Sequence, residues 1–183
     1  SINVLYYNGH AYYVKCSSDI NSFWEAQSYC EEHGGYLAII NDANENKALY
    51  DYVFNNMGYR SSYFGFTDDG SEGTWYWAGN YDISSYTNWV KGQPDNHGNV
   101  ENYALFYYED TPYKWNDGDF GKDSNRNVYF LIEWDYSEGS ATSSGMNIPS
   151  DAIAYNGHLY YLYDNDSKDW DAVLSFCESK GGI

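Results

Sequence analysis

The sequence has few basic residues, only three cysteines and no long apolar segment. Nine Lys and Arg residues stand against 27 Asp and Glu residues, which gives a formal net charge of −18. Nucleic-acid binding depends on Lys and Arg that neutralise phosphates, so this charge excludes it. No apolar run approaches the roughly 18 residues of a membrane span, so we expect no membrane insertion. The excess of acid instead favours the binding of cations.

The cysteines and the first residues leave more open. Cys16, Cys30 and Cys177 are odd in number, so at least one thiol has no partner within this chain, and the redox compartment is undecided. No signal peptide opens the chain, and Ser1 begins directly in a strand-like segment, which indicates a mature or excised fragment. Aromatic residues are abundant, at 21% with 23 Tyr, so we expect an aromatic and amphipathic core.

A repeated motif divides the chain. Tyr7-Asn8-Gly9-His10 returns as Tyr155-Asn156-Gly157-His158, and Cys30-Glu31 returns as Cys177-Glu178. A Ser- and Gly-rich segment between the copies is typical of a linker. We therefore predict one domain over residues 1–136, a linker over 137–151 and the first part of a second copy over 152–183. His10 and His158 repeat with the fold and are interpreted as structural. No pair among the four histidines has metal-ligand spacing, so no zinc site is predicted.

Within the first unit the patterns indicate an α+β fold. A strand is expected over 11–16, and Ser22 with Glu25 forms a capping box that opens a helix, closed by Gly34. Asp42 with Glu45 opens a second helix that ends near Gly58. A long, turn-rich stretch runs from 78 to 98. Further strand-like runs are 63–66, 74–77, 103–108 and 128–134.

Oxygen-bearing side chains gather in two short segments that we expect to be loops. They are Gln93 and Asp95 around Pro94, then Glu101, and then Asn116 and Asp117 after Trp115. Calcium takes about 6–8 oxygen ligands in a flexible shell, and three carboxylates with two amides nearly fill one. A cis Gln93–Pro94 bond would turn Gln93 and Asp95 toward the same point. The alternative is an acidic, Asn-rich surface loop.

This pattern resembles the sugar-binding calcium site of the C-type lectin family. The resemblance extends over 1–136, because Gly34-Gly35-Tyr36-Leu37-Ala38 looks like the turn after the family's first helix. Tyr63-Phe64-Gly65-Phe66 stands at the family's Trp-Ile-Gly-Leu motif. It implies two helices, small antiparallel sheets and a long calcium-binding loop region. Tyr103 and Ile132 replace the usual disulfide partners. Cys16 and Cys30 are then either a relocated disulfide or two buried free thiols.

The resemblance also implies how ligands are held. One calcium is expected at Gln93, Asp95, Glu101, Asn116 and Asp117, where two sugar hydroxyls complete the shell. The amide-first order of Gln93 and Asp95 resembles the galactose-type lectins. His97 occupies the nearby sugar-facing position, and Tyr107, Tyr108 or Tyr113 could supply a stacking ring; Trp115 is interpreted as core. A second calcium could use Asp68, Glu72, Asn96 and Glu101, although Asp68-Asp69-Gly70 is also an ordinary turn.

These features predict a calcium-dependent lectin that binds galactose-type terminal sugars on glycans, outside the cell. The alternative is a protein-binding adhesion module in which calcium only rigidifies the loop. An enzyme, such as a glycosidase with two carboxylates, is the third and least favoured hypothesis, because carboxylate pairs arise by chance among 27 acidic residues. The apolar helical face of the tail, from Trp170 to Cys177, must be covered. We expect it to dock on the first unit or on a second copy of the chain, with Cys177 as a free thiol.

Overall fold

The computed structural model describes residues 4–56, 58, 61–80, 84–107, 111–122, 126–135, 153–155 and 158–160. The chain separates into two units, one of residues 4–135 and one of residues 1–3 with 136–183. In the second unit the described residues are β9 (Ile153–Tyr155) and β10 (His158–Tyr160), which pair antiparallel. Tyr155 lies opposite His158, as Tyr7 lies opposite His10 in the first unit. The predicted helix around Trp170 and Cys177 lies outside the described residues, so its docking stays a prediction.

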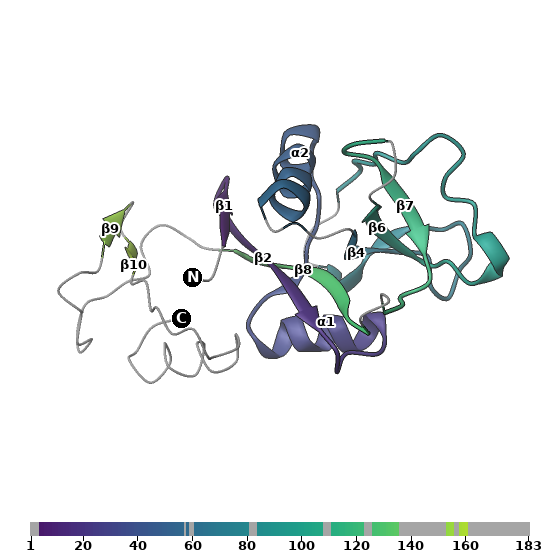
Figure 1. Ribbon diagram of the computed structural model, residues 1–183, viewed down its shortest axis with the longest axis horizontal. Coiled ribbons are helices and arrows are strands. Elements are labelled where there is room, and N and C mark those ends of the chain that lie inside the picture. Colours follow the sequence, from purple (N-terminus) through teal and green to yellow (C-terminus); the bar gives the residue numbers. More distant parts are fainter. Residues whose placement is uncertain are drawn as a thin grey trace. The chain divides into compact units, whose positions relative to one another are not determined.

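The first unit is α+β, with two helices and one mixed sheet (Figure 1). The sheet has the order β1-β2-β8-β4-β6-β7, with β3 paired to β8 and β5 paired to β4. All these pairs are antiparallel except β4 with β8. The strands are β1 (Leu5–Tyr7), β2 (His10–Ser17), β3 (Tyr36–Leu37), β4 (Ser61–Thr67), β5 (Tyr76–Trp77), β6 (Tyr103–Tyr107), β7 (Trp115–Gly118) and β8 (Val128–Asp135).

Both helices begin where their capping residues predict. In α1 (Phe23–Glu32) the Ser22 side chain accepts a hydrogen bond from the Glu25 N–H, and in α2 (Ala43–Asp51) Asp42 accepts from the Glu45 N–H. The Glu that follows each cap accepts a hydrogen bond from the residue before the cap. The Asn21 N–H donates to Glu25 at 2.7 Å, and the Asn41 N–H donates to Glu45 at 2.6 Å. After α2 the chain continues as a π-helical turn to Asn56, which keeps Tyr52 and Val53 buried.

The two faces of the sheet carry separate apolar clusters because side chains alternate along a strand. On β8, Leu131 packs with Phe64, Phe106 and α2, while Phe130 and Ile132 pack with Tyr63 and α1. The two helices therefore lie on opposite sides of the sheet, as Figure 1 shows. Gly65 permits a close approach, because a Cβ there would lie 2.7 Å from the Leu37 carbonyl oxygen.

The cysteine predictions are corrected by the structure. Cys16 and Cys30 are both free, and Cys16 is exposed whereas Cys30 is buried. The relocated disulfide is therefore wrong, as is the pair of buried thiols, because Cys16 lies on β2 with its side chain in solvent. Cys30 instead packs in one apolar cluster with Ile132, and the Tyr103 ring stacks on Phe23 at 4.6 Å. Apolar and aromatic contacts thus occupy both positions where the resemblance implies cysteines.

Candidate calcium and sugar site

The predicted oxygen donors meet at one end of the first unit. Gln93, Asp95, His97, Glu101 and Asn116 line a pocket of about 370 Å³, together with Val90 and Thr111. The Gln93–Pro94 peptide bond is cis, as predicted. Gln93 is tied to the sheet through the backbone, because its N–H donates to Val90 and the Val90 N–H donates to Trp115. Residues of the long loop and of a strand therefore converge on one space.

Asn116 and Asp117 lie on strand β7, so the prediction that they belong to a loop is wrong. Pairing with β6 places Asn116 opposite Leu105 and Asp117 opposite Ala104. Trp115, which precedes them, is fully buried, and its indole N–H donates to Asn46 Oδ1 at 2.6 Å. The interpretation of Trp115 as core is confirmed. Asn-Asp-Gly is typical of a turn, yet here it forms a strand that continues directly from the buried Trp115 ring.

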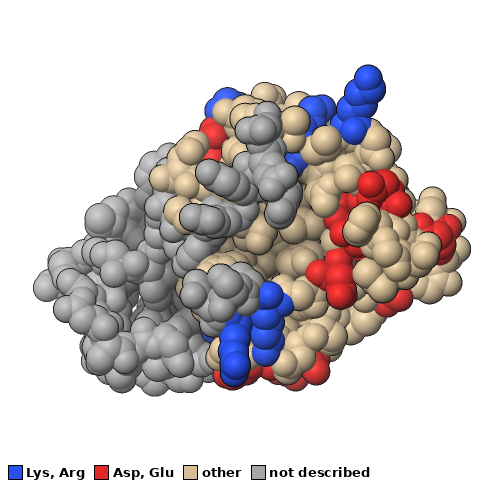
Figure 2. Space-filling model, turned by 45° about the vertical axis from the view of Figure 1, so that its right-hand side comes forward, with Lys and Arg blue, Asp and Glu red and all other residues tan. Residues whose placement is uncertain are grey.

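Asp117 joins the loop to the sheet. It is fully buried, and its carboxylate accepts hydrogen bonds from the backbone N–H groups of Asp95 and Asn96, the latter at 2.7 Å. Ligand oxygens of Asp95, Glu101 and Asp117 all lie within 4.8 Å of one another. We call these three carboxylates the loop cluster. Figure 2 turns this end of the unit forward and shows acidic side chains gathered there.

The loop cluster has an uncompensated negative charge. Among the described residues, no Lys, Arg or His side chain forms an ion pair with it, and backbone N–H groups are its donors. Burial raises the pKa of Glu101, a hydrogen bond from the His97 N–H lowers it, and the charges of Asp117 and Asp95 raise it further. A bound cation would remove this repulsion.

The donor set fits a calcium ion. Gln93 Oε1 is buried and has no hydrogen-bond partner among the described residues. Such an orphaned acceptor is costly unless a cation or a donor meets it. Three carboxylates and the amide oxygens of Gln93 and Asn116 supply only oxygen ligands, the type that calcium prefers. Gln93, Asp95, Glu101, Asn116 and Asp117 would hold the ion.

The second predicted set also lies together. Asp68 is buried, and its Oδ1 has no hydrogen-bond partner among the described residues. Asn96 links the two sets, since its side chain donates to Glu72 and accepts from the Glu101 N–H at 3.1 Å. Partial desolvation, followed by the charges of Asp68 and Asp117, raises the pKa of Glu72. The turn reading holds as well, because the Ser71 N–H donates to the Asp68 carbonyl.

Tyr113, the described candidate for the stacking ring, is not among the pocket residues. Tyr113 packs against Tyr50 at 4.9 Å and under the Lys47 ammonium group, on the side of α2. The Tyr107 side chain and Tyr108 lie outside the described residues. His97 is exposed and lines the pocket, so it is the described ring next to the donor set.

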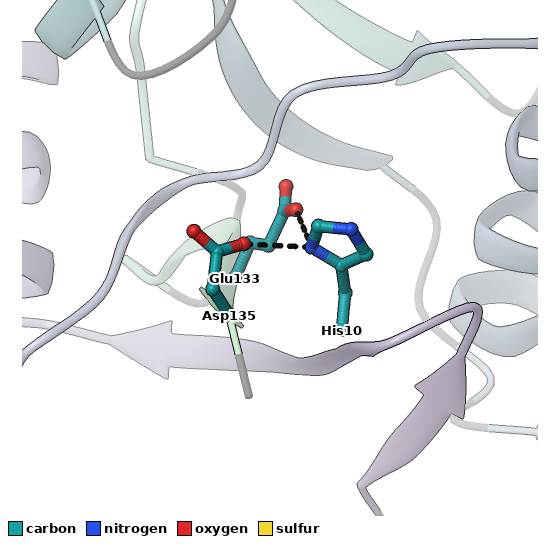
Figure 3. Close-up of side chains that lie close together, drawn as sticks. All are labelled: His10, Glu133 and Asp135. Carbon is teal, nitrogen blue, oxygen red and sulfur yellow. Dashed lines mark ion pairs between the residues drawn. The ribbon is translucent and has the colours of Figure 1, made fainter. Parts of the chain in front are cut away.

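A second cluster of ligand-type side chains was missed by the sequence analysis. His10 Nδ1 lies 2.7 Å from Glu133 Oε1 and 2.8 Å from Asp135 Oδ1 (Figure 3). We call these three residues the sheet-end cluster. Histidine spacing could not reveal it, because the two carboxylates lie on β8, which is far from His10 in sequence and is brought beside it by pairing with β2. The reading of His10 as only structural omitted these partners.

The fold and the oxygen-rich loop site define a C-type lectin-like domain. A family model described as lectin C-type domain matches residues 19–130. The chain therefore belongs to the C-type lectin domain family.

Relatives agree with this assignment. The chain is 37% identical over 98 residues to perlucin from Haliotis laevigata, covering 53% of this chain and 62% of that protein. It is 33% identical over 113 residues to hepatic lectin from Gallus gallus, covering 61% of this chain and 50% of that protein. The chain thus spans half to somewhat less than two thirds of these relatives. The carbohydrate-recognition domain of mouse scavenger receptor C-type lectin superposes with a TM-score of 0.58 at 25% identity, covering 73% of this chain and 94% of that chain.

Proposed function

We propose that residues 4–135 form a calcium-dependent carbohydrate-binding domain that prefers galactose-type terminal sugars. The observation that carries this proposal is the pocket itself. Four predicted donors line it, and the fifth, Asp117, belongs to the loop cluster with two of them. The buried Gln93 Oε1 has no hydrogen-bond partner among the described residues. An ordinary acidic loop does not require these donors to converge.

The donor chemistry explains how sugar hydroxyls would be selected. A bound calcium ion would attract hydroxyl oxygens into its remaining coordination positions. Ionised Asp95 and Glu101 accept hydrogen bonds only, whereas the amides of Gln93 and Asn116 both donate and accept. A hydroxyl between an acid and an amide therefore has one donor and one acceptor role. The order of Gln93 and Asp95, which resembles galactose-type lectins, supports the galactose preference.

The proposed calcium site also bears on the location and the partners of the protein. Calcium is abundant outside cells and scarce in cytosol, so we propose an extracellular location, with glycans or glycoproteins as partners. No helix in the described part of the chain has the length and apolar character of a membrane span. We also propose self-association through residues 152–183, most of which lie outside the described ranges.

Retention on galactose resin tests the proposal. The chain should bind in calcium and elute with a chelator, and a glycan array with and without chelator would extend the result to other sugars. Asp95→Ala should abolish retention with the fold intact, because Asp95 lies on an exposed loop. Asp119→Ala is the matched control, since Asp119 is exposed beyond β7 and does not line the pocket.

Three outcomes would contradict the proposal. Retention that survives chelation would remove calcium from the mechanism. Calcium binding without retention of any glycan would favour the protein-binding alternative. Glycoside hydrolysis that continues in chelator would favour an enzyme instead.

A further inference from the structure

The sheet-end cluster lies where β2 begins and β8 ends. His10 and Asp135 are cross-strand neighbours in the β2–β8 ladder, and Glu133 lies two residues before Asp135 on the same face of β8. Figure 3 shows the imidazole facing both carboxylates. Two paired strands therefore fix three ligand-type side chains, and a flexible loop is not needed to assemble them.

Neighbouring groups hold the two carboxylates in place. Glu133 Oε2 accepts a hydrogen bond from the Ile39 N–H at 2.8 Å. The Tyr36 hydroxyl lies 3.0 Å from Glu133 Oε1 and 2.6 Å from Asp135 Oδ1. Hydrogen bonds from a surrounding shell are the usual means by which proteins orient metal ligands.

The cluster has more short contacts between its polar atoms than hydrogen atoms to fill them. His10 Nδ1 offers one hydrogen and the Tyr36 hydroxyl offers one, yet each of these atoms faces both carboxylate oxygens. His10 Nδ1 is buried, and its one hydrogen can point at only one of the two carboxylate oxygens that lie 2.7 and 2.8 Å away. A single cation centred between the nitrogen and the two oxygens would satisfy all three atoms.

The charge balance around the cluster also favours a bound cation. Glu133 and Glu45 are both buried, and Tyr12 donates its hydroxyl hydrogen to Glu45 beside the cluster. Together with Asp135 they give three carboxylates, facing one imidazole and the Tyr12 and Tyr36 hydroxyls. A protonated His10 compensates one negative charge. A divalent ion bound by a neutral imidazole compensates two.

We propose that His10, Glu133 and Asp135 bind a divalent transition-metal ion of the zinc class, with water in the open position. One nitrogen and two carboxylate oxygens are ligands that zinc accepts, and three protein ligands with a water form a familiar open zinc site. Calcium is disfavoured because it prefers oxygen ligands alone. Asp135 has a side-chain exposure of 67%, so an ion can enter from solvent.

Titration of the full chain with zinc chloride tests this proposal. Excess calcium is kept present so that the loop cluster and His97 do not take up zinc. We expect one zinc ion per chain, and at least about a tenfold loss of affinity in His10→Gln and in Asp135→Asn. His33→Gln is the matched control, because the His33 ring stacks on Tyr29 away from the cluster and should bind zinc like the parent chain.

Cobalt(II) gives a second measurement. Its absorption should show a low-coordinate site with a nitrogen ligand in the parent chain, and this band should disappear in His10→Gln. If His10→Gln fails to fold, Asp135→Asn decides, since Asp135 is exposed. The proposal is overturned if the parent chain takes up no zinc, if both variants bind it as tightly as the parent chain, or if the cluster takes calcium in preference to zinc.

Discussion

The loop cluster and the sheet-end cluster place carboxylates close together in two different ways. In the loop cluster, Asp117 and Glu101 face backbone N–H groups, and no cationic side chain among the described residues pairs with them. In the sheet-end cluster, His10 lies within 2.8 Å of both carboxylates. Under the proposed function, the first cluster therefore takes its counter-charge from a cation in solution, whereas the second has a titratable partner in the chain. Calcium should govern one and pH the other.

Calcium removal should have the largest effect on this comparison. A ligand that binds only the folded state stabilises it by RT ln(1 + [L]/Kd), about 2.7 kcal/mol at a hundredfold excess over Kd. Thermal melts in calcium and in chelator should differ accordingly. Asp117→Asn should remove the difference, because it weakens the loop cluster at its buried member. Identical melts of the parent chain would contradict a calcium-dependent loop.

His10→Gln should lower the free energy of unfolding by about 1–3 kcal/mol, because it leaves the buried Glu133 carboxylate without its charged partner. The loss should be the same in calcium and in chelator. Urea unfolding of both chains in both buffers measures it. A loss that vanishes in chelator would mean that the two clusters are coupled.

The two clusters should change the stability of the folded chain over different ranges of pH. The hydrogen bond and charge of Glu133, with Asp135, raise the pKa of His10 to about 9 although burial opposes this. A raised folded-state pKa gives stability that is complete below the ordinary value of 6.5 and lost as pH rises through about 9. The difference between the parent chain and His10→Gln, measured in chelator, should shrink over that range.

The contribution of Glu101 to stability should also fall as pH rises, but in the acid range. Its folded-state pKa is also raised, so in chelator its contribution is lost as pH rises above the usual range of a Glu carboxyl. Calcium should reverse this loss by stabilising the ionised form. Unfolding from acid to neutral pH, with and without calcium, measures it; a calcium effect independent of pH over this range would contradict the assignment of Glu101.

The smallest expected effect is a change of sugar preference. Gln93→Glu combined with Asp95→Asn exchanges the acid and the amide and keeps the total charge. We expect calcium stabilisation to remain while the preference moves from galactose toward mannose by about tenfold, or 1.4 kcal/mol. Paired titrations with both sugars measure it. A double variant that keeps its galactose preference would show that these two residues do not set specificity.

Local signals predicted the parts of the fold that short segments determine. Ser22 and Asp42 cap helices because their side chains satisfy N–H groups two or three residues away. The run from Thr74 to Trp77 forms a strand only at Tyr76 and Trp77, where β4 is available for pairing. Strand β7 was missed because its Asn-Asp-Gly sequence favours a turn, and pairing with β6 overrides that preference.

The two clusters also differ in whether short segments of sequence determine them. The loop donors were found because Gln93, Asp95 and Glu101 lie near one another in sequence. The sheet-end cluster depends on the register that sets His10 opposite Asp135, and register follows from the whole sheet. Sequence spacing carries no record of such a contact.

The division of the proposed calcium ligands between a strand and a loop has a consequence for how this domain can change over generations. Asn116 and Asp117 continue from the buried Trp115, so substitutions there disturb the core as well as the ion. Gln93 and Asp95 lie on the surface loop, where a substitution leaves the sheet intact. Under the proposed function, we therefore expect sugar preference to change by substitutions in the loop, whereas the half of the site on the strand is constrained together with the fold.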